Sequence, residues 1–291
     1  TLDDAYTPDK TVANLKEIAD KYSPVAFLGT FGVPPVAAAL PVLAQLKIPG
    51  VGLTSGAALV RTPHNPYAFP VRASYAAEAQ KLASQVKTVG VTKVSAIYID
   101  NPFGEALRDN LQSALSKESI AVEFFKVDVP AATAAKVVAQ VVASAPQAVL
   151  ILTTSQVAVP VLRELKKTSS RGYLYTFSVV DTTIVIKELG SSASGLGVTQ
   201  IVPVPSGSKF PVVVEYLNAL KALGRGTPSF YGLEGYLEAK VLVEGLRRAG
   251  GGFCDRRRCA VCRAARALVP PVARDAMLRL PSVLNNGTAP T

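Results

Sequence analysis

Cysteine, histidine and long apolar runs are scarce in this chain of 291 residues. Residues 1–253 contain no cysteine, and all three cysteines follow them. A cysteine-free body suits an oxidising compartment, although many cytosolic domains also lack cysteine. No uninterrupted apolar run reaches the roughly 20 residues needed to cross a bilayer. The acidic, polar start of the chain is not a signal peptide.

Groups for catalysis or metal binding are equally sparse. The only histidine, His64, sits in a turn-rich loop and is predicted to be exposed. A general base needs a nucleophile or a second partner within reach, and no G-x-S-x-G nucleophile turn occurs. Cys254, Cys259 and Cys262 supply only three of the four ligands of a structural zinc site. These observations predict neither an enzyme nor a metal site.

Phosphate-binding loops and nucleic-acid-binding patches are also missing. The glycines of Gly190–Gly197 precede a strand, the reverse of a dinucleotide-binding fingerprint, so they predict a helix C-cap and a strand entry. Residues 251–291 hold seven arginines and two aspartates, whereas the body mixes 24 basic with 19 acidic residues. Because basic and acidic residues are mixed in residues 1–250, the sequence shows no basic patch of the kind that binds nucleic acid. We therefore expect neither a cofactor nor a nucleic-acid partner.

What the chain does contain is a regular alternation of strand and helix patterns. Val94–Ile99 is apolar and partly β-branched, so it predicts a buried strand; a turn at 100–104 and an amphipathic helix follow. Further strands are predicted at 24–28, 48–53, 67–72, 121–127, 147–152, 173–178 and 195–202. Helices are predicted between them, one of them at 37–46, and at 209–223 and 229–249. The helix that Ser74 begins has Glu78 near its positive, N-terminal end. This alternation predicts an α/β fold with doubly wound parallel sheets and helices on both faces.

Two such units are expected, with crossings near 72–74 and 202–205, where small residues or prolines follow a strand. Residues 1–73 would then form the first part of lobe 1 and residues 74–203 would form lobe 2. The helices of 204–250 would return to lobe 1. Residues 251–291, rich in Arg, Cys and Pro, differ sharply from every preceding segment.

Loops rich in Gly, Ser and Thr follow five of the strands, at 29–32, 54–57, 100–104, 153–155 and 178–181. Ligands of open parallel sheets bind beyond the carboxyl ends of the strands, and small residues allow a close approach. Any single loop could simply end a strand, but five in succession favour a ligand cleft. The candidate ligand-binding residues are Thr30, Phe31, Thr54, Ser55, Gly56, Ala57, Asp100, Phe103, Thr153, Ser178 and Asp181.

Several segments also match a known family in order. They are A-F-L-G-T-F-G, I-P-G-V-G-L-T-S-G-A, F-P-V-R-A-S-Y, V-S-A-I-Y-I-D-N-P-F-G, P-Q-A-V-L-I-L-T and S-F-Y-G-L-E-G-Y-L-E-A. With them the chain resembles the leucine/isoleucine/valine-binding proteins, the type I periplasmic receptors of ABC importers. The resemblance implies two α/β lobes joined by hinge crossovers that close on a small solute. It also implies a periplasmic monomer that delivers this solute to an inner-membrane permease.

The resemblance carries over to individual residues only in part. Gly56 and Ala57 are kept in the second loop, and Phe103 matches an aromatic residue of the third. The family's first-loop hydroxyl falls near Val33, and its second-lobe acid falls at Ser178, where Asp181 could substitute. An amino acid, an aromatic acid, a short organic acid or an amide all stay open as ligands.

Both ends of the chain depart from the family pattern. The family's opening strand, helix and second strand would precede Thr1, so we expect an incomplete, poorly folding first lobe. The tail after Gly250 does not resemble the family's closing elements and is interpreted as a reading-frame shift. Three alternatives remain: a sensing domain with the same fold, an enzyme on a doubly wound fold, or a degenerate product that binds nothing.

Overall fold

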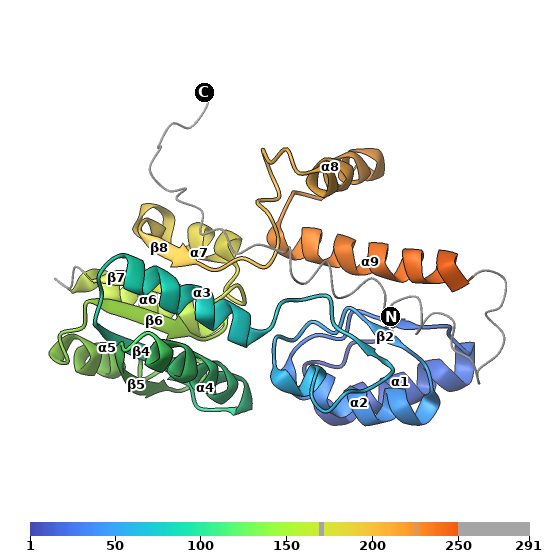
Figure 1. Ribbon diagram of the computed structural model, residues 1–291, viewed down its shortest axis with the longest axis horizontal. Coiled ribbons are helices and arrows are strands. Elements are labelled where there is room, and N and C mark those ends of the chain that lie inside the picture. The colour runs from blue at the N-terminus through green and yellow to red at the C-terminus, as the bar shows by residue number, and fades with distance from the viewer. Residues whose placement is uncertain (169–171, 225, 250–291) are drawn as a thin grey trace. The chain divides into compact units, whose positions relative to one another are not determined.

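The computed structural model describes residues 1–168, 172–224 and 226–249 (Figure 1). The chain divides into two compact units, which we call unit 1 and unit 2. Unit 1 comprises Thr1–Ser74 and the described residues from Val202 onward, and unit 2 comprises Tyr75–Ile201. The chain therefore passes between the units twice, at the first crossing after Ser74 and the second crossing after Ile201. In the described ranges, no helix is long and apolar enough to span a membrane.

Unit 1 is built around three short parallel strands in the order β1-β2-β3. Its register aligns Leu28, Val51 and Phe69, so the loops after the three strands start from one edge. We call it the unit 1 edge. The elements of unit 1 are α1 (Pro8–Tyr22), β1 (Phe27–Leu28), α2 (Val33–Leu46), β2 (Gly50–Val51), η1 (Ala58–Val60), β3 (Ala68–Phe69), α8 (Pro211–Leu223) and α9 (Phe230–Ala249).

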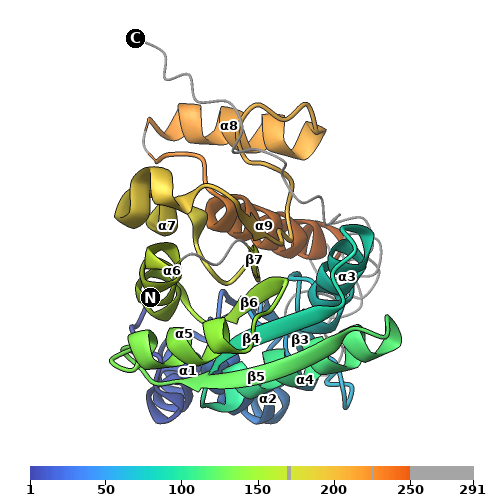
Figure 2. The same cartoon turned by 90° about the vertical axis from the view of Figure 1, so that its left-hand side faces the viewer.

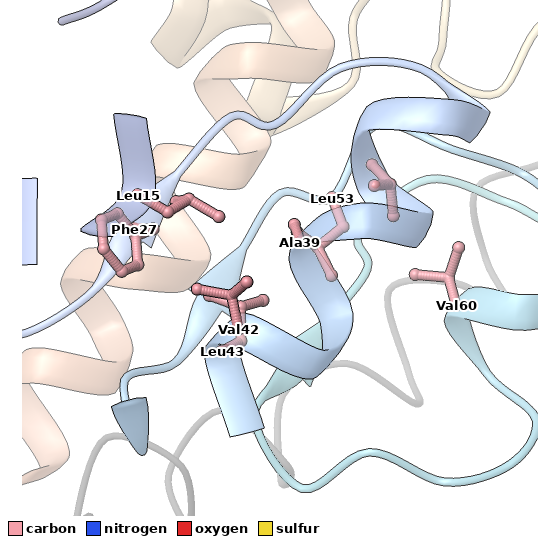
Figure 3. Packing of buried hydrophobic residues seen from close by; sticks show 8 residues of the cluster. Leu15, Phe27, Ala39, Val42, Leu43, Leu53 and Val60 are labelled. Atoms are coloured by element: carbon pink, nitrogen blue, oxygen red, sulfur yellow. The ribbon is translucent and has the colours of Figure 1, made fainter. Parts of the chain in front are cut away.

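Apolar clusters cover this sheet. Side chains of α1 and α2 pack with β1 in one of them, in which Leu15, Phe27 and Leu43 are buried (Figure 3). In the other, Val241 of α9 packs with Val51 and Phe69 of the sheet. Burial of each such side chain stabilises the fold by about 1.5–3 kcal/mol. Because these parallel strands are covered by helices, most of their residues are buried, which explains why β1, β2 and β3 lie in apolar sequence.

Unit 2 contains a five-stranded parallel sheet in the order β5-β4-β6-β7-β8. The first three of these strands lie side by side in Figure 2. The elements of unit 2 are α3 (Tyr75–Thr88), β4 (Lys93–Ile99), α4 (Pro102–Lys117), β5 (Ala121–Val127), α5 (Ala134–Ala143), β6 (Ala148–Leu152), α6 (Ser155–Lys167), β7 (Tyr173–Thr176), α7 (Thr182–Leu189), η2 (Gly190–Ala193) and β8 (Leu196–Val198).

The strand order of unit 2 reverses at β4. The chain moves from β4 to β5 in one direction and then back across β4 to β6. Right-handed crossovers place α4 and α5 on opposite faces of the sheet as a result. Helix α3 packs on α4, whereas α5 packs on α6 and α6 on α7. This arrangement confirms the predicted α/β fold with parallel sheets, and it puts a topological switch point between β4 and β6.

The predicted strand bounds hold better in unit 2 than in unit 1. Strand β5 has the predicted bounds, whereas the predictions for 24–28, 48–53 and 67–72 are too long, because only two residues of each are strand. Prolines explain part of the difference, since a proline lacks the N–H that a ladder hydrogen bond requires. Strand β2 begins directly after Pro49, and β3 ends directly before Pro70.

Helix α2 also begins earlier than the predicted residue 37. Gly32 is its N-cap, and Pro34 and Pro35 lie in its first turn. Proline is tolerated there because the first N–H groups of a helix have no partner within the helix. The two prolines therefore belong to the start of the helix rather than to the loop before it.

Candidate functional site

The first two loops of the unit 1 edge stay paired beyond their strands. The Thr54 N–H donates to the Thr30 carbonyl at 2.8 Å, and the Gly32 N–H donates to the Thr54 carbonyl at 3.1 Å. An isolated parallel bridge joins Phe31 to Thr54. Three of the predicted ligand residues, Thr30, Phe31 and Thr54, are thus brought together.

A buried carboxyl group lies directly behind these loops. The Thr54 hydroxyl donates to Oε1 of Glu238 in α9 at 3.0 Å, and Glu238 is only 5% exposed. Gly52 makes this approach possible, because a Cβ atom there would lie 2.5 Å from the Glu238 carboxyl carbon. Burial, helped by the negative charge of Glu234, raises the pKa of Glu238 to about 8, although Thr54 and Arg72 oppose the shift. Glu238 is therefore mostly protonated at neutral pH.

Beside Glu238 lies a buried ion pair. The Arg72 guanidinium nitrogen Nη1 donates to both carboxylate oxygens of Glu234, at 2.8 and 2.7 Å. Both side chains are almost fully buried, and Arg61 donates to the backbone carbonyl of Arg72. Breaking such a pair leaves an uncompensated charge, which makes it a sensitive point of unit 1.

The candidate residues did not include Glu234 and Glu238, although the sequence held a signal for them. Both are buried on α9 with Leu233, Val241 and Gly245. Spacings of three and four residues place such side chains on one helix face, so two acids stand within an otherwise apolar stripe. An acid in that stripe indicates a buried partner.

Phe31 carries the exposed aromatic ring of this edge and is 53% exposed. The rings of Tyr6 and Tyr231 approach it, with centroids 6.3 and 6.5 Å away and tilted or edge-on geometry. Tyr6 fits because a Cβ atom at Gly32 would lie 2.2 Å from its ring. Burial raises the pKa of the Tyr6 hydroxyl. The second loop is more enclosed, with Ser55 and Ala57 buried beneath it.

The unit 2 edge, formed by the loops after β4, β6 and β7, contains the remaining predicted residues. The register pairs Tyr98 with Leu152 and Ile151 with Thr176, so these loops start at one edge. Asp100 is exposed and forms an ion pair with Lys126 of β5, with Oδ1 and Nζ 2.9 Å apart. Thr153 is buried.

The loop after β4 is a helix start. Asn101 caps α4, its Oδ1 accepting from the Gly104 N–H at 2.9 Å. Gly104 must be a glycine, because a Cβ atom there would lie 1.9 Å from the Ile99 carbonyl oxygen. Phe103, the matching aromatic of the third loop, is only 5% exposed and packs edge-on against Tyr75 at 6.0 Å. Its ring therefore belongs mainly to the core of unit 2.

Side chains from other elements hold the loop after β7 at both ends. The Ser178 N–H donates to Glu78 Oε2 at 3.0 Å, and the Asp181 N–H donates to Ser155 Oγ at 2.8 Å. Asp181 also caps α7 by accepting from the Thr183 N–H at 2.8 Å. Glu78 stands near the positive end of α3, as the sequence predicts, but the structure also buries it completely.

The structure also shows where His64 and the glycines of 190–197 lie. His64 is exposed, as predicted, and Gly190 is the C-cap of α7 with β8 following, which confirms that interpretation. The described residues contain no group of three side chains that could hold a metal ion. Cys254, Cys259 and Cys262 lie outside the described residues.

A surface depression of about 620 Å³ lies beside the end of α8. Its lining, mostly apolar, consists of Leu217, Leu220, Lys221, Gly224, Gly226, Thr227 and Pro228. It contains none of the predicted ligand residues and is open to solvent. The strand-end loops, which carry polar groups at the carboxyl ends of parallel strands, are the better candidates.

A family model described as periplasmic binding protein matches residues 1–277. The chain belongs to this family. Membership confirms the resemblance found in the sequence, and the family's fold is one that binds solutes. No curated protein matches the chain.

Solved structures of other binding proteins superpose well on this one. A substrate-binding periplasmic protein from Ralstonia solanacearum is 29% identical, with 90% of this chain and 75% of that chain covered and a TM-score of 0.81. A possible leucine/isoleucine/valine-binding protein from Rhodopirellula baltica is 23% identical, with 92% and 73% covered and a TM-score of 0.81. A solute-binding protein from Rhodopseudomonas palustris in complex with benzoate is 15% identical, with 91% and 72% covered and a TM-score of 0.80. The last two support the fold alone.

Proposed function

We propose that this binding protein captures a small carboxylate-bearing solute in the periplasm and delivers it to an inner-membrane ABC permease. The observation that carries the proposal is the family match over residues 1–277. Delivery to a permease is supported by a solved structure similar to this chain, the ABC transporter substrate-binding protein of Aeropyrum pernix. We infer that the chain acts as a monomer without a cofactor.

In this proposal the solute is captured between the two units by the loops of both edges. Hydroxyl groups and main-chain N–H groups at strand ends suit a carboxylate, which accepts several hydrogen bonds. The residues proposed to contact it are Thr30, Phe31, Thr54, Ser55, Gly56, Ala57, Asp100, Thr153, Ser178 and Asp181, whereas Phe103 would support the third loop from the core. Ligand binding would favour a closed arrangement of the hinge, and no covalent step is required.

Two of the similar structures are named with ligands that fit the proposed chemistry. One similar structure is a possible leucine/isoleucine/valine-binding protein, and another holds benzoate. An amino acid and benzoate both present a carboxylate beside an apolar group. The exposed ring of Phe31 at the unit 1 edge suits that apolar group.

A thermal-shift screen of the full chain tests the proposal. The screen uses three classes of solute: amino acids, aromatic acids and short organic acids. A ligand at a hundredfold excess over its Kd stabilises the fold by about 2.7 kcal/mol, so one class is expected to raise the Tm clearly. Cooperative unfolding without a shift in any class would contradict a carboxylate ligand.

A pair of matched variants locates the ligand. Phe31 and Phe210 are similarly exposed, at 53% and 51%, but only Phe31 lies at the unit 1 edge. We expect Phe31→Ala to weaken binding about tenfold, since it removes most of an aromatic contact. Phe210→Ala should leave the Kd of the solute found in the screen unchanged, as measured by calorimetric titration. Equal losses in both variants would place the ligand elsewhere.

A further inference from the structure

A buried carboxylate of α3 joins three separate parts of unit 2. Glu78 lies in the first turn of α3 and is completely buried. Its Oε2 accepts from the Ser178 N–H at 3.0 Å and from the Thr199 hydroxyl at 2.6 Å. The Ser178 N–H is shared with the Thr199 hydroxyl oxygen, at 3.2 Å. Because an unsatisfied buried donor costs stability, a single oxygen that accepts from both groups makes an efficient anchor.

The three partners occupy distinctive places in the chain. Ser178 opens the loop Ser178–Asp181, which belongs to the unit 2 edge. Glu78 comes shortly after the first crossing, and Thr199 comes shortly before the second crossing. The carboxylate thus connects the loop to both segments by which the chain enters and leaves unit 2.

The loop itself is short and is held at its other end as well. The Asp181 N–H donates to Ser155 Oγ, and the Val180 N–H closes a turn onto the Phe177 carbonyl at 3.0 Å. With both ends fixed, its conformation depends on three side chains from outside the loop, those of Glu78, Thr199 and Ser155. Preorganised binding groups need to lose less conformational freedom when a ligand arrives.

We propose that Glu78 is a positioning residue for solute binding, because it fixes the loop Ser178–Asp181 and links it to both crossings. The inference rests on the proposed function for its ligand, but the anchoring itself does not. In this proposal Glu78 contacts the loop and Thr199 rather than the solute. Its effect on affinity passes through the Ser178 backbone.

Two substitutions of Glu78 separate anchoring from general stability. In Glu78→Gln the amide oxygen can still accept from Ser178 and Thr199, but the NH₂ group then takes the place of Oε1. That atom is buried and has no hydrogen-bond partner among the described residues. Glu78→Gln should therefore lower the Tm while keeping the loop in place, because an unpartnered buried donor costs stability. Glu78→Ala removes the nearer acceptor of the Ser178 N–H, leaves the longer hydrogen bond to Thr199, and should loosen the loop.

A third variant controls for destabilisation elsewhere in unit 2. Ser95 is fully buried on β4, and its hydroxyl is 2.8 Å from that of Ser144. Ser95 lies near the amino end of its strand, away from the unit 2 edge. Ser95→Ala should lower the Tm without changing the loop.

The test measures backbone hydrogen exchange in the full chain without ligand. We expect Glu78→Ala to speed exchange in peptides covering 177–182 about tenfold or more, since losing the Glu78 acceptor weakens the protection of the Ser178 amide. Glu78→Gln and Ser95→Ala should change it less than about threefold. Unchanged exchange in Glu78→Ala, or equal acceleration in Ser95→Ala, would overturn the proposal.

Titration with L-leucine and with benzoate then completes the test. For the one that the wild type binds, Glu78→Ala should raise the Kd about tenfold, and Glu78→Gln should restore most of the affinity. A Kd that follows the Tm across all three variants would overturn the positioning role. If the loop is released but the wild type binds neither compound, the anchoring is upheld, and leucine and benzoate are excluded as the solute.

Discussion

In unit 1 the carboxyl group behind the edge is Glu238 of α9, whereas in unit 2 it is Glu78 of α3. Glu238 accepts from a side-chain hydroxyl and stands next to the Arg72–Glu234 ion pair. Glu78 accepts from a backbone N–H and a hydroxyl. Both units therefore fix a strand-end loop from a helix, but unit 1 does so with a group whose pKa is strongly raised.

The sheets of the two units also differ in the length of their strands. Unit 1 pairs only two residues in each of three strands, whereas unit 2 pairs up to seven in β4 and β5. Fewer ladder hydrogen bonds leave unit 1 more dependent on the contacts of its helices, α9 above all. We therefore expect the buried Arg72–Glu234 pair to contribute strongly to the stability of unit 1, where the backbone ladder is shortest.

The largest expected effect comes from breaking the ion pair of unit 1. Arg72→Met leaves Glu234 and Glu238 without their buried cation, so unfolding should cost about 3–5 kcal/mol less. Hydrogen exchange should accelerate in β1, β2 and β3 before it does in unit 2. The exposed pair of Lys240 with Glu215 is the control, and Lys240→Met should cost less than about 1 kcal/mol. Equal losses from both variants would show that burial of the pair contributes nothing.

The second effect is a pH dependence specific to unit 1. The folded pKa of Glu238, about 8, lies above its ordinary value of 4.5, so the folded state binds the proton more tightly. Stability is then fully present below pH 4.5 and is lost as the pH rises toward 8, by about 1.4 kcal/mol for each unit within that window. Glu238→Gln should remove this loss and be more stable than the wild type at pH 8.

Urea unfolding at several pH values between 4 and 9 measures the difference between wild type and variant. Glu215→Gln serves as the control, because Glu215 is half exposed and pairs only at the surface. A difference curve for Glu238→Gln that stays flat with pH would contradict the raised pKa. The groups that face Glu238 are Glu234, Arg72 and Thr54, and none of them changes in either variant.

The smallest expected effect is the loss of stability when a helix N-cap is replaced, compared between one helix of each unit. Asp181 caps α7 with a side-chain hydrogen bond, whereas Thr7 caps α1 without one. Asp181→Ala should lower the free energy of unfolding by about 1 kcal/mol, and Thr7→Ala should lower it by less than half of that. Urea midpoints of the two variants without ligand provide the measurement. A larger loss at Thr7 would mean that the cap geometry does not control these helix ends.

Local sequence patterns were sufficient for the class of fold and for most elements. Apolar strands followed by amphipathic helices predicted the parallel sheets, and the bounds of β5 agree residue by residue. These patterns did not predict the bounds of elements that depend on neighbouring residues. Prolines, which lack a ladder donor, bound β2 and β3, and the early start of α2 depends on Gly32 as its cap.

The candidate site divides in the same way. Strand-end loops could be predicted, because apolar runs followed by helical patterns locate the ends of strands. Their fixing residues could not, since Thr54 and Glu238 are 184 residues apart and Glu78 and Ser178 are 100 apart. Phe103 shows that a strand-end position does not by itself make a ligand contact. Its place in the sequence suits such a contact, but its ring packs on Tyr75.

The sequence by itself determined the alternation of elements, the exposed loop of His64 and the family to which the chain belongs. These follow from local periodicity, turn residues and short motifs, which act over a few residues. The tertiary structure alone decided which carboxyl groups are buried, which backbone groups they hold and how far the pKa of Glu238 rises. Desolvation and long-range hydrogen bonds set these properties, and both exist only once distant segments have packed together.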